Sequence, residues 1–167
     1  NIKQLHTRYN PNSDESSNSF EDKLSKQMAG ASDNVLQLLA ELFWFHFCCE
    51  SSIGGTKKRE HIQRVLNWMS KPALIPTNLS EALNSGMANG GVAFKTYRAQ
   101  QLWFLFDFVL SWKGQPIEQQ QALLDDPWAF KTYLFELPIK MAYVQRNALL
   151  HLIHPESFEE IYARDHK

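Results

Sequence analysis

Apolar residues recur along most of this chain at the three- and four-residue spacing of an α-helix, and turn-forming residues separate the apolar stretches. No stretch of four or more residues bounded by hairpin turns alternates apolar and polar positions as a strand would. The pattern predicts an all-α fold, an irregular single-domain bundle of seven or eight helices. The expected helices cover residues 20–29, 33–50, 56–69, 78–86, 94–113, 116–124, 127–137 and 139–153, with a last turn or two at 156–162.

Two of these segments, 33–50 and 94–113, carry apolar side chains around nearly their whole circumference. A helix that is apolar all round is a buried one, so both are expected in the core, with 33–50 at its centre. Short polar side chains before a helix satisfy its free amide groups. The expected helix caps are Ser19, Asp33, Thr56 and either Asp125 or Asp126.

The start of the chain lacks this apolar pattern. Residues 10–19 are Asn, Pro, Ser, Asp and Glu only, a composition that favours turns and solvated coil. We therefore expect a flexible tail or linker over residues 1–19 and one helical domain over residues 20–167.

Composition narrows the class of protein. With 44% hydrophobic residues, the 167-residue chain can form a core without disulfides or metals, and its formal net charge of −1 is unlike that of a dedicated nucleic-acid-binding domain. Its only two cysteines are adjacent, no signal peptide is recognisable in the sequence, and no apolar run approaches the roughly 20 residues that span a membrane. These features favour a soluble cytoplasmic protein. The sequence starts without Met, so we expect this chain to be a piece of a longer protein.

The glycine-rich segment 52–58 precedes an expected helix, where free amides attract phosphate. The spacing of its glycines and lysines does not fit a nucleotide-binding loop, and a helix precedes it instead of a strand. We therefore favour a capped loop with a solvated basic turn. His46, Cys48 and Cys49 match metal ligands in type only, since their spacing on a helix does not converge on one ion, so no metal site is predicted. The pair His151 and His154 is expected to have a capping or surface role.

Glu41 and Asp107 interrupt apolar helices, where burial could prepare a carboxylate for catalysis. The same two residues could instead pair with Arg98 or Arg146. The chain has none of the nucleophile or metalloprotease motifs that would accompany a catalytic carboxylate. We therefore favour structural pairing over an enzyme that uses Glu41 or Asp107.

Basic residues gather near the starts of two expected helices, where positive charge is unfavourable against the helix dipole. Their presence there suggests contact with DNA phosphates or docking of an acidic partner. A solvated face without a partner explains the same charges equally well. The candidate DNA- or partner-binding residues are Lys57, Lys58, Arg59, Arg64, Lys95 and Arg98.

Five blocks together resemble the helical region that precedes the motor domain in McrB-like AAA+ NTPases of modification-dependent restriction systems. The blocks are 40–44 (AELFW), 53–60 (IGGTKKRE), 90–94 (GGVAF), 126–130 (DPWAF) and 146–159 (RNALLHLIHPESFE). The resemblance covers residues 20–167 and rests on apolar, structural positions.

This resemblance implies a non-catalytic accessory or connector domain in anti-phage defence, with the ATP- or GTP-hydrolysing motor beyond Lys167. Nucleotide and Mg²⁺ would then bind the parent motor, and this fragment would hold no cofactor. The implied partners are that motor and, through it, an McrC-like nuclease. The alternative is a DNA-binding domain that uses the basic helix starts near Lys57 and Lys95.

Overall fold

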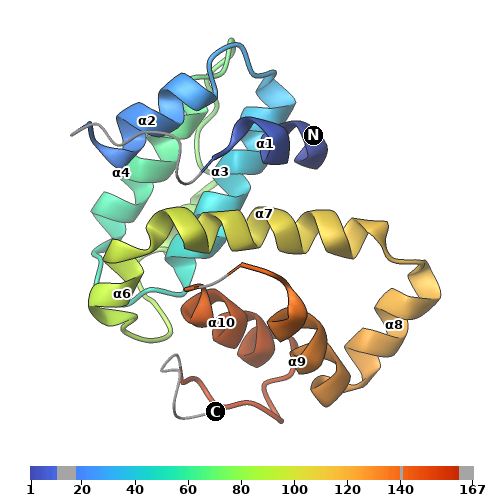
Figure 1. Ribbon diagram of the computed structural model, residues 1–167. Coiled ribbons are helices and arrows are strands. Elements are labelled where there is room, and N and C mark those ends of the chain that lie inside the picture. The colour runs from blue at the N-terminus through green and yellow to red at the C-terminus, as the bar shows by residue number, and fades with distance from the viewer. Residues whose placement is uncertain (11–17, 140, 162–167) are drawn as a thin grey trace. The chain divides into compact units, whose positions relative to one another are not determined.

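The computed structural model describes residues 1–10, 18–139 and 141–161 (Figure 1). Within these residues the regular elements are helices, which confirms the all-α prediction, and eight of them have seven or more residues. The helices are α1 (Ile2–Arg8), α2 (Phe20–Gln27), α3 (Asp33–Cys48), α4 (Gly55–Leu66), α5 (Thr77–Ala82), α6 (Gly91–Thr96), α7 (Arg98–Gly114), α8 (Ile117–Asp125), α9 (Pro127–Glu136) and α10 (Tyr143–Ile153). None of these helices is long and apolar enough to cross a membrane.

The chain divides into two compact units, Asn1–Met87 and Ala88–Lys167, where the sequence predicted one domain over 20–167. In the first unit, α3 packs on α1 and, most extensively, on α4. The buried face of α4 is the predicted stripe of Ile62, Val65 and Leu66. The buried face of α3 includes Leu36, Leu39, Phe43 and Phe47.

The predicted tail over 1–19 is wrong for its first ten residues. Ile2 and Leu5 of α1 are buried, as is Tyr9, and the Arg8 guanidinium donates hydrogen bonds to the carbonyl groups of Ala29 (2.8 Å) and Gly30 (3.1 Å). These three apolar residues are spaced by three and four, so they form one stripe of a helix that the polar run after it obscured. Residues 11–17 of that run lie outside the described residues, and Ser19 at its end caps α2.

Two predicted caps are wrong. Ser32, not Asp33, is at the N-cap of α3, and the Asp33 carboxylate instead accepts hydrogen bonds from the Ser70 amide (2.8 Å) and hydroxyl (2.7 Å). These bonds lower the pKa of Asp33. Thr56 lies inside α4, which begins after Gly54 without a side-chain cap. Asp33 therefore joins the start of α3 to the segment that follows α4.

The second unit centres on α7, which α6 and α10 contact. The predicted helix 94–113 is divided at Tyr97, whose φ of −104° and ψ of 25° end α6. The buried Gln101 spans this break by donating to the Ala93 carbonyl at 3.2 Å. Asp126 caps α9 as expected, since its carboxylate accepts from the amides of Trp128 and Ala129.

The last helix, α10, begins at Tyr143 and not at Ile139. Arg146 explains the shorter helix, because its guanidinium donates to the carbonyl groups of Leu134 (3.0 Å), Leu137 (3.0 Å) and Ile139 (2.6 Å). These bonds hold the segment after α9 in an irregular course. Arg146 also lies over the Phe104 ring, 4.4 Å from its centroid.

Candidate functional site

Lys58, predicted to lie on an exposed basic turn, is buried. Its side chain is 1% exposed, and Nζ donates a 2.6 Å hydrogen bond to the Ser85 carbonyl. Burial lowers the pKa of the Lys58 ammonium, and the nearby Cys48 and Glu50 partly oppose this shift. Because a buried charge requires such partners, Lys58 fastens the segment around Ser85 to α4 and is not presented to DNA or to another protein.

Arg59 is half-buried and also has partners within the chain. Its Nη1 donates to the Ser80 carbonyl at 3.0 Å and to Asn84 Oδ1 at 2.7 Å. Both acceptors are neutral and lie in or directly after α5. Arg59 therefore joins α4 to α5, and part of its hydrogen-bonding capacity is already used.

The remaining basic candidates are divided between the two units. Lys57 and Arg64 lie exposed on α4, whereas Lys95 is exposed on α6 and Arg98 is half-buried on α7. Of the four candidates in the first unit, Lys57 and Arg64 are exposed, whereas Arg59 is half-buried and Lys58 is buried. The structure therefore shows a smaller basic surface near Lys57 than the sequence predicted.

The glycine-rich segment follows α3, so a helix precedes it as the sequence indicated. A Cβ atom on Gly55 would lie 2.7 Å from Asn84 Oδ1, which shows that this glycine permits a close approach of the 84–86 segment. Gly86 is packed more tightly still, because a Cβ there would clash with the Glu50 carbonyl. These glycines allow two backbone segments to pack closely, a sufficient structural reason for their presence.

The two cysteines pack at the end of α3, with their Sγ atoms 3.6 Å apart. The hydrogen bond with Cys49 and burial raise the pKa of Cys48, whose thiol also donates to the Phe45 carbonyl at 3.2 Å. In the part of the chain that the structure describes, no three His, Cys, Asp or Glu side chains converge on a metal site. His151 Nδ1 lies 2.8 Å from the Phe158 carbonyl, so this histidine holds the turn after α10.

Asp107 and Glu41 have different surroundings. Asp107 is half-buried on α7 and lies near Arg146. Burial lowers the pKa of Arg146, and interactions with Tyr143 and Asp107 partly oppose this shift. The structural pairing predicted for Asp107 with Arg98 or Arg146 stays a prediction. Glu41 is exposed on α3 and accepts a 3.0 Å hydrogen bond from Gln37.

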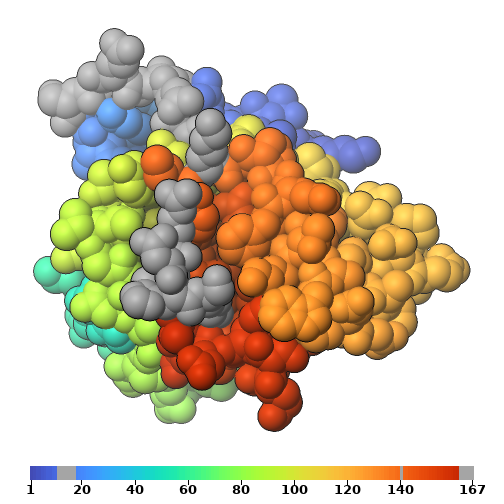
Figure 2. Space-filling view, turned by 60° about the horizontal axis from the view of Figure 1, so that its bottom comes forward, coloured from blue at the N-terminus to red at the C-terminus, as the bar shows by residue number. Residues whose placement is uncertain are grey.

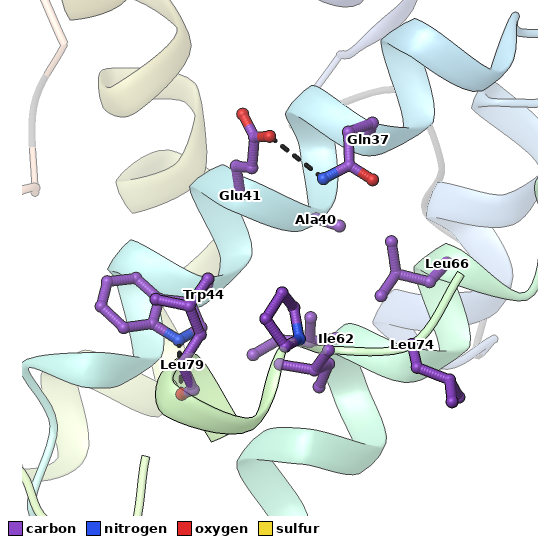
Figure 3. Close-up of a pocket in the computed structure, with 10 residues that line it drawn as sticks. Gln37, Ala40, Glu41, Trp44, Ile62, Leu66, Leu74 and Leu79 are labelled. Atoms are coloured by element: carbon purple, nitrogen blue, oxygen red, sulfur yellow. Dashed lines mark hydrogen bonds between the residues drawn. The ribbon is translucent and has the colours of Figure 1, made fainter. Parts of the chain in front are cut away.

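Glu41 lies at the edge of an apolar pocket of about 100 Å³ in the first unit (Figure 3). The pocket lies between α3, α4 and the segment that leads into α5. Leu74 at its mouth is 83% exposed, whereas Ala40 and Ile62 in its wall are buried. The ten lining residues are Gln37, Ala40, Glu41, Trp44, Ile62, Leu66, Leu74, Ile75, Pro76 and Leu79.

The pocket was not predicted, although the sequence between Pro72 and Pro76 contains an indication of it. Pro72 and Pro76 exclude a helix from the segment between them, yet that segment carries the apolar pair Leu74 and Ile75. Apolar residues in a short non-helical segment must either pack on a neighbouring helix or remain exposed. Here Ile75 is half-buried and Leu74 is exposed, so the segment forms one wall of an open pocket.

The second unit has exposed apolar residues on α8 and α9, the helices whose residues are coloured yellow to orange in Figure 2. Ile117 is 79% exposed and Trp128 is 62% exposed. The Lys131 ammonium lies 5.3 Å from the Trp128 ring centroid, and the Trp128 ring packs edge-on against Phe158.

Comparison of the chain with protein-family models, curated proteins and solved structures gave no match. The resemblance to McrB-like proteins therefore stays a prediction from the five sequence blocks. In the structure these blocks lie in α3, at the start of α4, in and before α6, at the start of α9 and in α10 with the turn that follows it.

Proposed function

We propose that this chain is a non-catalytic helical interaction domain that acts in the cytoplasm as a connector in an McrB-like AAA+ NTPase. The observation that supports an interaction role is the open apolar pocket between α3, α4 and the 74–79 segment. Apolar surface with a polar rim is typical of sites that bind other proteins. The McrB-like assignment rests on the five sequence blocks. Nucleotide, Mg²⁺ and an McrC-like nuclease would then belong to the parent motor and its assembly.

The surroundings of Glu41 favour binding over catalysis. The ten pocket residues include no serine, threonine, cysteine, histidine or lysine, so no nucleophile or second titratable group accompanies the carboxylate. General acid–base catalysis and nucleophilic catalysis both need such a partner within hydrogen-bonding reach. Glu41 is instead bonded to the neutral Gln37 amide.

The DNA-binding alternative has less support from the structure. Lys58 is buried, and Arg59 donates to two acceptors within the chain. Each phosphate contact that is lost lowers DNA affinity and its salt dependence. We therefore expect no binding of a 50-base-pair duplex, methylated or not, in fluorescence anisotropy at low salt. Salt-sensitive binding that Lys57→Ala and Arg64→Ala weaken would favour the alternative.

Nucleotide hydrolysis by the whole gene product tests the connector proposal. Deletion of the region is expected to leave basal hydrolysis in place and to abolish its stimulation by DNA, because the connector couples the two. A deletion variant with unchanged stimulation would contradict the connector role. Absence of nucleotide hydrolysis from the intact gene product would contradict its assignment to this class of NTPase.

A further inference from the structure

The pocket beside Glu41 is held open by contacts on both of its sides. On one side, the Trp44 indole N–H donates a 2.9 Å hydrogen bond to the Leu79 carbonyl, which fixes the ring against the start of α5 (Figure 3). On the other side, Gln63 Nε2 donates to the Ala73 carbonyl at 2.7 Å and positions the segment before Leu74. The small side chain of Ala40 leaves space between these walls.

The size of the pocket limits what can occupy it. Pockets for drug-sized molecules and cofactors have volumes of about 300–1,000 Å³, whereas this one measures about 100 Å³. That space suits one aliphatic or aromatic side chain. A single side chain bound in an open hollow gains little by itself, so it must belong to a larger partner. The size therefore favours a polypeptide that inserts one anchor residue.

The charge at the edge limits the occupant further. Glu41 is the one charged residue among the ten that line the pocket, and the Gln37 amide holds one of its oxygens at 3.0 Å. In Figure 3 these two side chains form one edge of the pocket, with Trp44 and Leu79 farther along α3 and α5. A carboxylate held in this way favours a cation next to the inserted side chain and disfavours a second carboxylate.

We propose that this pocket binds a protein segment that inserts one apolar side chain between α3 and the 74–79 segment and places a Lys or Arg beside Glu41. The proposal rests on the proposed function, since it specifies the partner chemistry of an interaction domain. The anchor residue contributes affinity by leaving water. The neighbouring cation contributes specificity, because an exposed ion pair adds little affinity by itself.

Titration of the purified chain with short peptides tests this proposal. The probe is Ac-Ala-Leu-Lys-Ala-NH₂, and the matched peptides replace Leu with Ala or Lys with Glu. Binding is followed by the ¹⁵N–¹H resonance of the Trp44 indole, assigned with Trp44→Phe. We expect the Leu-Lys peptide to shift this resonance, the Leu→Ala peptide to bind about tenfold more weakly and the Lys→Glu peptide about threefold more weakly.

Two variants locate the binding. Ala40→Leu fills the pocket and is expected to abolish the shift without lowering the melting temperature. Glu41→Gln keeps the pocket but removes the charge, so the Leu-Lys and Leu-Glu peptides should then bind equally. Because Glu41 is exposed, 0.5 M NaCl should likewise reduce the preference for Lys.

The opposite results overturn the proposal. No shift of the Trp44 resonance at 10 mM Leu-Lys peptide, equal binding of the Leu-Glu peptide, or unchanged binding to Ala40→Leu would each do so. Binding of duplex DNA with the same Trp44 response would assign the pocket to a different class of partner. These measurements need no nucleotide hydrolysis, so their failure is distinguishable from failure of the connector role.

Discussion

Replacement of Lys58 by Met tests whether an internal charge holds the first unit together. Met keeps the apolar stem of the side chain but removes the ammonium, which donates a 2.6 Å hydrogen bond to the Ser85 carbonyl. A hydrogen bond that involves a charged group contributes about 1.5–3 kcal/mol to stability. Its loss also removes a positive charge that interacts with Glu50, which is 0% exposed.

The substitution also has a stabilising effect, because folding no longer requires the ammonium of Lys58 to lose its hydration. Breaking a buried charge arrangement by removing one partner nevertheless destabilises proteins in most cases. We therefore expect the free energy of unfolding to fall by about 2 kcal/mol at pH 7. The assay is urea unfolding followed by circular dichroism and by the fluorescence of the tryptophans.

Lys57→Met provides the matched control, since Lys57 is the exposed neighbour on the same helix. Substitutions at such surface positions change stability by no more than about 0.5 kcal/mol. If Lys58→Met and Lys57→Met unfold at the same urea concentration, the reasoning from the Ser85 hydrogen bond is refuted. A lower midpoint for Lys58→Met alone supports it.

The lowered pKa of Lys58 adds a pH dependence with a defined sign. Since the folded-state pKa lies below the unfolded value, the unfolded chain binds more protons between the two values, and stability rises with pH in that window. Lys58→Met lacks this contribution. The stability difference between the wild type and Lys58→Met should therefore grow as pH rises from the lowered pKa toward the ordinary pKa of Lys, and a difference that shrinks would contradict the assignment.

Three other predictions concern single contacts. Gly86→Ala should destabilise the first unit by about 1–3 kcal/mol because its Cβ would clash with the Glu50 carbonyl, whereas Gly114→Ala, with open space around it, should not lower the melting temperature. Asp126→Ala should cost about 1 kcal/mol through loss of the α9 cap, and Asp125→Ala, outside the cap, should cost less in the same thermal unfolding assay. Asp33 has a lowered pKa, so its stabilising bonds to Ser70 are complete above the ordinary pKa of Asp and are lost as pH falls through the lowered value. Acid unfolding of Asp33→Asn should accordingly lack the part of the pH dependence that the wild type shows below pH 4, and identical acid profiles would contradict this.

Helical periodicity predicted most of the fold because it depends on local spacing. The stripe of Ile62, Val65 and Leu66, the stop at Gly30 and the cap at Asp126 all involve residues within one or two turns of each other. The first helix was missed because Ile2, Leu5 and Tyr9 form a short stripe beside a long polar run. Short helices of this kind are stabilised by the surface on which they pack and not by their own sequence.

The candidate site is formed by contacts between residues far apart in the sequence, which the local spacing of residues cannot predict. The sequence predicted Lys58 on an exposed basic turn. Its side chain is instead buried and donates a hydrogen bond to the carbonyl of Ser85, which lies 27 residues further along the chain. Asp33 likewise looked like a helix cap, but its partner Ser70 lies 37 residues away. The pocket beside Glu41 forms for the same reason, since its walls come from α3, α4 and the 74–79 segment.

The most direct test of the proposed connector role is the ratio of DNA-stimulated to basal nucleotide hydrolysis in the whole gene product carrying Ala40→Leu. This variant fills the pocket that we assign to a partner segment and leaves the rest of the connector in place. We expect this ratio to fall to about that of the deletion variant. An unchanged ratio in a folded Ala40→Leu protein would contradict the claim that this domain acts through its pocket.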